Sequence, residues 1–151
     1  MEVGDKMRLP ECAKLIKVGT AIDERGQLCF TENAELPFRI ERVFWISNIP
    51  EGESRGRHAH RVCAEIVFPA QGAFDMFVSD SDGERTYRME DPNVGIYIGP
   101  NVWCELKNFS RDAVCVVLAS HPYMAEGYVN EYEEFRRETL SPLSLKGREL
   151  K

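Results

Sequence analysis

Two of the chain's three histidines are one residue apart, in the stretch Arg55-Gly-Arg-His58-Ala-His60. In an extended strand, residues i and i+2 point to the same face, so we predict that the His58 and His60 imidazoles lie side by side. Two imidazoles at a fixed spacing can transfer protons near neutral pH, or they can bind a metal ion. The arginines beside them could bind an anion through bidentate hydrogen bonds.

The spacing around these histidines resembles the first metal-binding motif of the cupins. The matching residues are Gly52, His58, His60, Glu65 and Gly72. Two imidazoles and a carboxylate would supply three metal ligands. This depends on a turn over residues 61–64 that brings Glu65 inward, because in an uninterrupted strand Glu65 would face away from the histidines.

The fourth ligand of the cupin pattern is a histidine in a second motif, and residues 95–105 contain none. Cys104 or Glu105 would have to replace it. We therefore predict no bound metal and no cofactor. A metal-dependent cupin enzyme that uses His58, His60 and Glu65 stays open as an alternative.

Short runs rich in β-branched and aromatic residues alternate with turn residues along most of the chain, which is typical of an all-β protein. The nine predicted strands span residues 15–18, 27–31, 39–47, 65–70, 73–79, 84–90, 95–99, 102–106 and 113–119. We predict a double-sheet jelly roll, the double-stranded β-helix of cupins, followed by a short amphipathic helix over residues 126–138. The domain would span 1–151, with its core at about 13–137 and a loose polar tail at 139–151.

Composition excludes several classes of function. A net charge of −6 argues against a nucleic-acid partner, because no overall field attracts phosphates. The five cysteines form no C-x-x-C pair, which favours buried thiols in a reducing compartment. The sequence shows neither a signal peptide nor a run of membrane-spanning length, so we expect a cytoplasmic protein without a membrane partner.

Arg42 is the polar member of an otherwise apolar strand face that it shares with Ile40, Phe44 and Ile46. Such an arginine can either bind an anion inside the barrel or extend from a strand end toward solvent. Both interpretations remain open at this stage.

Three blocks resemble the nucleotide-sugar 3,4-ketoisomerases, also called the WxcM-like or FdtA family. The blocks are residues 38–44, 55–61 and 94–103, and the resemblance spans about residues 13–137. It implies a metal-independent cupin that forms homodimers by exchanging N-terminal strands. It also implies that dTDP-4-keto-6-deoxyglucose is converted to its 3-keto isomer, with catalysis by His58 and His60. Arg42 and Arg55 would then lie at the diphosphate.

The chemistry of that reaction suggests individual roles. We expect His60 to carry the proton between C3 and C4, and His58 to position a sugar hydroxyl or relay the oxygen proton. Glu65 and Trp103 are expected to contact the substrate. Tyr97 is better explained by core packing, and we expect a structural role for His121.

The chain departs from the family pattern near the site. It has Glu65 where glutamine is common, Cys104 where histidine is common, and Phe44-Trp45 where tyrosines are common. These changes leave the exact substrate and the stereochemistry at C4 open. A non-catalytic sugar-nucleotide binding module is a second alternative.

Overall fold

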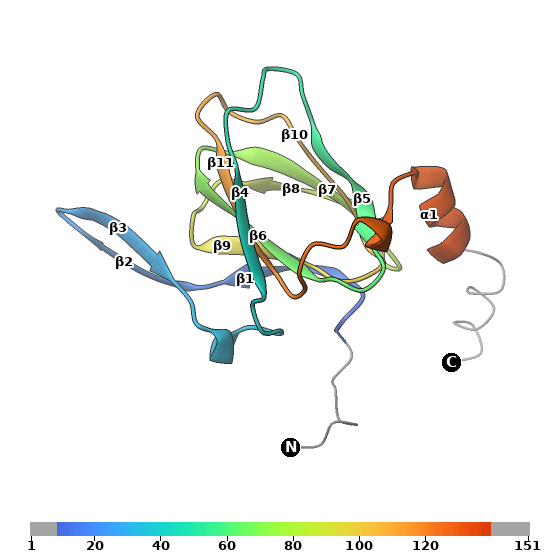
Figure 1. Ribbon diagram of the computed structural model, residues 1–151. Coiled ribbons are helices and arrows are strands. Elements are labelled where there is room, and N and C mark those ends of the chain that lie inside the picture. Colours follow the sequence, from blue (N-terminus) through green and yellow to red (C-terminus); the bar gives the residue numbers. More distant parts are fainter. Residues whose placement is uncertain (1–8, 140–151) are drawn as a thin grey trace.

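The computed structural model describes residues 9–139, which form two five-stranded antiparallel sheets, a two-stranded hairpin and an α-helix (Figure 1). The strands are β1 (Ala13–Lys17), β2 (Gly19–Asp23), β3 (Gly26–Phe30), β4 (Arg42–Ile46), β5 (Arg55–His60), β6 (Glu65–Gln71), β7 (Phe74–Asp80), β8 (Gly83–Met89), β9 (Val94–Ile98), β10 (Trp103–Lys107), β11 (Val114–Ala119) and β12 (Tyr128–Val129). The helix α1 spans Tyr132–Thr139, and two short 3₁₀ turns span Asn33–Glu35 and Ala125–Gly127.

From β4 onward the chain passes repeatedly between the two sheets. The first sheet has the order β1-β9-β6-β11-β4, and the second has the order β12-β5-β10-β7-β8. The main core lies between them, because side chains from both sheets, such as Val67, Met76, Leu106 and Val117, form one buried cluster. This arrangement confirms the predicted all-β jelly roll of the cupin type with a short C-terminal helix.

Each sheet also buries part of its outer face. On the first sheet, Ile66, Tyr97 and Leu118 pack against Phe38 from the segment before β4. On the second sheet, α1 covers Trp103 with Phe135. Both faces of these strands are therefore apolar. The order of apolar and polar residues in the sequence alone does not show which side chains face the interior.

The β2–β3 hairpin projects away from the two sheets (Figure 1), and within residues 9–139 its two strands pair only with each other. It carries exposed apolar side chains, with Ile22 73% and Leu28 61% exposed. Among residues 9–139, no helix is long and apolar enough to cross a membrane.

The structure differs from the prediction in the hairpin and in the helix. Residues 19–23 form a strand that the sequence pattern does not predict, and the helix begins at Tyr132 rather than at residue 126. Tyr128 and Val129 instead pair with His60 and Ala59 at the edge of β5. Apart from Thr139, the predicted tail lies outside the described residues, and the single domain over 1–151 stays a prediction.

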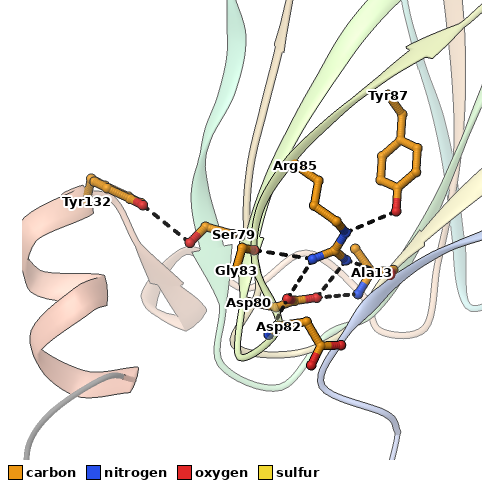
Figure 2. A network of polar contacts seen from close by, with 8 residues as sticks. All are labelled: Ala13, Ser79, Asp80, Asp82, Gly83, Arg85, Tyr87 and Tyr132. Atoms are coloured by element: carbon orange, nitrogen blue, oxygen red, sulfur yellow. Dashed lines mark hydrogen bonds and ion pairs between the residues drawn. The ribbon is translucent and has the colours of Figure 1, made fainter.

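A partly buried ion pair joins β1 to the β7–β8 hairpin (Figure 2). The Asp80 carboxylate accepts hydrogen bonds from the Ala13 amide at 2.9 Å and from Arg85 at 2.9 and 3.0 Å. Arg85 also donates to the Ala13 carbonyl at 2.9 Å and to the Tyr87 hydroxyl at 3.0 Å. Both polar groups of the Ala13 backbone are therefore held by one Asp–Arg pair that belongs to the opposite sheet.

We predict that Asp80→Ala lowers the free energy of unfolding by about 2–4 kcal/mol, because it leaves Arg85 and the Ala13 amide without their shared acceptor. Urea denaturation measures this change. Asp23→Ala is the matched control, since Asp23 forms an ion pair with Arg25 on the exposed hairpin. We expect no measurable change for the control. Equal stability of the two variants would contradict the structural importance of the Asp80–Arg85 pair.

Candidate active site

Three aromatic rings meet where β5 and β12 pair. The His58 and His60 ring centroids are 4.8 Å apart, so the two imidazoles do lie on one face as predicted. The Tyr128 ring lies 4.8 Å from His58 and 4.5 Å from His60. A phenol is thus packed against both imidazoles.

A β-bulge in β5 brings Arg55 to the same face as His58, although regular alternation would separate them. Opposite β10, the partners are Cys104↔His58, Glu105↔Gly56 and Leu106↔Arg55. Arg57 is therefore an additional residue in β5 and lies in the left-handed region, with φ 60°, next to Gly56 with φ 83°. A side chain on Gly56 would come within 3.2 Å of the Cys104 carbonyl oxygen, so glycine suits this close approach.

Glu65 reaches the histidines because the chain turns between β5 and β6. Strand β5 ends at His60 and β6 begins at Glu65. Residues 61–64 therefore form the predicted turn that allows Glu65 to face the same interior as the histidines. Glu65 Oε2 lies 3.2 Å from His60 Nε2, and the two side chains are 8% and 6% exposed. Burial alone would raise the pKa of Glu65, but the contact with His60 and the nearby charges of His58 and Arg42 hold that pKa below its usual range. Glu65 is therefore an ionised carboxylate against His60.

His58 is a weak base because of its surroundings. Burial, together with the charge of His60, lowers the pKa of His58 to about 4 against the opposing effect of Glu65. His58 is therefore neutral at pH 7.

His58 and Glu65 line a cavity of about 250 Å³ inside the barrel, whereas His60 lies behind them and is not part of its lining. Its polar lining consists of Arg42, Arg55, His58, Glu65, Cys104, Tyr123 and Tyr128. The apolar wall includes Phe44, Val67 and Val117, and the buried ring of His60 lies against His58 and Tyr128. The volume is just under the roughly 300 Å³ at which pockets for drug-sized ligands begin, so one sugar ring fits better than a whole nucleotide.

The structure does not bring Trp103 to this cavity, which corrects its expected role as a substrate contact. Cys104 faces the cavity, so Trp103, its neighbour in β10, lies on the outer face. There its ring packs against Tyr132 and Phe135, and its Nε1 donates to Glu105 at 3.0 Å. Trp103 attaches α1 to the second sheet.

Two further residues from the sequence lie elsewhere. Tyr97 is buried outside the first sheet, where its hydroxyl donates to the Pro10 carbonyl at 2.8 Å. His121 Nδ1 lies 2.7 Å from Ser120 Oγ, and neither residue lines the cavity of His58. Both positions agree with the structural roles expected of them.

Three potential metal ligands lie close together at this site. The donor atoms of His58, His60 and Glu65 all lie within 4.8 Å of one another, so these side chains could hold a metal ion. The metal-dependent alternative therefore stays open, and we derive no step through a metal.

Residues 11–139 match the family model described as FdtA: WxcM-like, C-terminal. The chain belongs to this family. It is 35% identical, over 82% of its length and 90% of the relative, to the TDP-4-oxo-6-deoxy-alpha-D-glucose-3,4-oxoisomerase of Aneurinibacillus thermoaerophilus.

Solved structures agree with this membership in the FdtA family. QdtA, a sugar 3,4-ketoisomerase from Thermoanaerobacterium thermosaccharolyticum in complex with TDP, has a TM-score of 0.81 and 32% identity over 85% of this chain and 94% of that one. A histidine-to-asparagine variant of QdtA was solved in complex with TDP-4-keto-6-deoxyglucose, with 30% identity and a TM-score of 0.81 over 86% and 95% of the two chains. The WlaRB TDP-quinovose 3,4-ketoisomerase from Campylobacter jejuni has 36% identity and a TM-score of 0.77 over 83% and 97%.

Sequence reasoning missed Tyr128 as a cavity residue of this FdtA-family chain. Its spacing to Tyr132 and Phe135 matches a helix, and the helix predicted over residues 126–138 includes it. Gly127 and Asn130 flank the Tyr-Val pair, and both residue types commonly interrupt or begin helices. These two residues were the available signal that Tyr128 precedes the helix.

The low pKa of His58 predicts a specific loss of stability in acid. Between about pH 6.5 and pH 4 the unfolded chain binds a proton at His58 that the folded chain does not, so folding stability falls as the pH falls through this window. Glutamine has no group that titrates in this window. We therefore expect the free energy of unfolding of His58→Gln to fall by about 3 kcal/mol less than that of the wild type between pH 7 and pH 4. Urea denaturation at pH 7 and pH 4 measures it.

His121→Gln is the matched control, because His121 lies outside the cavity against Ser120. We expect this variant to keep the acid sensitivity of the wild type. An unchanged pH dependence in His58→Gln would show that burial of His58 is not what destabilises the protein in acid.

Proposed function

We propose that this protein is a sugar-nucleotide ketoisomerase that moves the keto group of a dTDP-4-keto-6-deoxyhexose between C4 and C3. The observation that carries the proposal is the pair of packed imidazoles, backed by a buried carboxylate, at a cavity of sugar size in a chain of the FdtA family. The relatives named as 3,4-ketoisomerases support the same substrate class.

The ketone at C4 acidifies the hydrogen on C3, so a base can remove that proton and form an enediol. His60 has the ionised Glu65 carboxylate 3.2 Å from its Nε2 and is the candidate base. His58, with its pKa near 4, is too weak a base for this step at pH 7. We assign to His60 the transfer of the proton from C3 to C4, and to His58 the positioning of a sugar hydroxyl.

The two arginines suit the charged part of the substrate. Arg42 and Arg55 line the same cavity from two different strands. Arg42 on β4 lies opposite Ala119 of β11, and Arg55 on β5 lies opposite Leu106 of β10. A nucleotide sugar whose sugar ring fills the cavity can place its diphosphate against a guanidinium group, which binds phosphate oxygens through bidentate hydrogen bonds. No nucleic acid, membrane or cofactor enters this proposal, and the free cysteines of the described residues suit action in the reducing cytoplasm.

His60→Asn tests the proposal most directly. In deuterated water the wild-type protein should convert dTDP-4-keto-6-deoxyglucose to its 3-keto isomer and incorporate deuterium at the reacting carbons. We expect His60→Asn to lose both activities by at least about 100-fold and to bind dTDP nearly as well as the wild type. NMR spectroscopy of the sugar and calorimetry of dTDP binding provide the two measurements.

Arg55→Ala provides the contrast, because its main effect should be weaker dTDP binding. Wild-type exchange rates in His60→Asn would exclude His60 as the base. A wild-type protein that binds dTDP but exchanges no carbon-bound proton would be a binding module rather than an enzyme.

We also propose that the protein is a homodimer that uses the outer face of the first sheet and the β2–β3 hairpin. Val43 and Trp45 on β4 are 49% and 68% exposed, and Phe30 on the hairpin is 50% exposed. A hollow of about 460 Å³ lies between the hairpin and the sheet, lined partly by Phe30, Phe68 and Leu118. Exposed apolar groups of this extent favour association. Strand β1 pairs with β9 of its own chain, so the exchanged segment would be the hairpin.

Trp45→Arg should convert the dimer to a monomer, because it places a charge within the apolar face. Sedimentation equilibrium measures the mass. Val62→Arg is the matched control, since Val62 is 50% exposed but lies in the β5–β6 connection. A dimer that survives Trp45→Arg, or a wild-type monomer, would rule out this interface.

A further inference from the structure

Moving a ketone from C4 to C3 requires two proton transfers on oxygen as well as two on carbon. The hydroxyl at C3 must lose a proton and the oxygen at C4 must gain one. His60 is occupied with the carbon-bound proton in the proposed mechanism. A second group that can both donate and accept a proton must therefore face O3 and O4.

His58 is poorly suited to this second role. At pH 7 its ring is neutral, so it donates a hydrogen bond from one nitrogen and accepts only at the other. Among the other cavity residues, Arg42 and Arg55 donate only, Glu65 is held by His60, and the Cys104 thiol has its pKa raised by burial. Tyrosine hydroxyls remain, because a phenol can rotate and serve as donor and acceptor.

Two tyrosines line the cavity, and their environments distinguish them. Tyr123 is 64% exposed and offers the face of its ring to Arg42, at 5.7 Å. Tyr128 packs against both imidazoles and lines the same cavity as Arg42, whose positive charge favours the phenolate form. Arg42 is itself held between the rings of Phe44 and Tyr123, at 5.1 and 5.7 Å. Since arginine only donates, Arg42 does not compete for the proton of the Tyr128 hydroxyl.

We propose that Tyr128 is a second catalytic residue, which shuttles one proton between the C4 and C3 oxygens of the sugar. This inference rests on the proposed ketoisomerase function. The phenol is positioned by the imidazoles and by Arg42, whose positive charge stabilises the phenolate that forms in each turnover. Burial raises the pKa of Tyr128, so the resting group is the neutral donor that the first step requires.

The steps balance without an additional reactant. His60 takes the proton from C3, the electron pair of that C–H bond forms the C3–C4 double bond, and the Tyr128 phenol protonates O4. The phenolate then takes the proton from the C3 hydroxyl as the C3 ketone forms, and the His60 imidazolium protonates C4. One C–H bond and one O–H bond break at C3, one of each forms at C4, and both side chains return to their starting states.

Tyr128→Phe is the test, because phenylalanine keeps the ring that packs against both imidazoles. The probe is dTDP-4-keto-6-deoxyglucose in deuterated water, with isomer formation and deuterium at C3 of recovered substrate measured by NMR. We expect isomerisation to fall by about 100-fold or more, with dTDP affinity within about twofold of the wild type. Without the oxygen shuttle, the intermediate returns to substrate, so the ratio of C3 exchange to isomerisation should rise about tenfold or more.

Tyr132→Phe is the matched control, since the Tyr132 hydroxyl contacts Ser79 and Glu84 outside the cavity. Tyr132→Phe should keep the wild-type ratio of C3 exchange to isomerisation. Isomerisation by Tyr128→Phe within threefold of the wild type, or an unchanged ratio, would overturn the shuttle. A wild-type protein that neither exchanges nor isomerises would overturn the ketoisomerase function itself, which is a distinguishable result.

Fluorotyrosine at position 128 provides a second measurement that preserves the fold. Fluorination lowers the pKa of the phenol and leaves its shape nearly unchanged. We expect the alkaline limb of the kcat profile to move to lower pH, whereas a purely structural tyrosine would leave that limb in place. An unmoved limb would contradict a proton-transferring role.

Discussion

The cavity depends on one additional residue in β5. A regular strand would send Arg55 and His58 to opposite faces, because side chains alternate. The left-handed backbone at Gly56 and Arg57 absorbs one residue and restores both side chains to the interior. The two histidines beyond the bulge keep their regular spacing and remain neighbours. A cation and two imidazoles thus share one interior face, which uninterrupted pairing between β5 and β10 would not allow.

Burial then gives chemically identical side chains different properties. His58 is kept neutral by the loss of water around it, while His60 has an ionised carboxylate at 3.2 Å. Glu65 in turn stays ionised because His60, His58 and Arg42 surround it. The division of labour between the histidines arises from their neighbours rather than from their own chemistry.

Local patterns predicted the features that depend on local geometry. The i, i+2 spacing placed the histidines together, the turn at 61–64 brought Glu65 inward, and the strands between turns predicted a jelly roll. The alternation of apolar residues did not predict on which side of β10 the Trp103 side chain lies. Trp103 and Cys104 are both apolar, and β10 is covered on both sides. Nor did the sequence pattern predict the position of Tyr128, which depends on pairing with β5, sixty-eight residues earlier in the chain at His60. Non-local pairing and a bulge without a strong sequence signal account for these differences.

The Asp80–Arg85 pair also affects how subunits can come together. By holding both backbone groups of Ala13, it fixes the first strand to its own barrel before the chain enters the projecting hairpin. Each subunit can therefore complete its two sheets without a partner. Dimer formation would then be the docking of folded bodies, a second-order process that is separate in time from the first-order folding of each chain. Dilution would slow the assembly and leave folding unaffected, so the barrel and its cavity would form first.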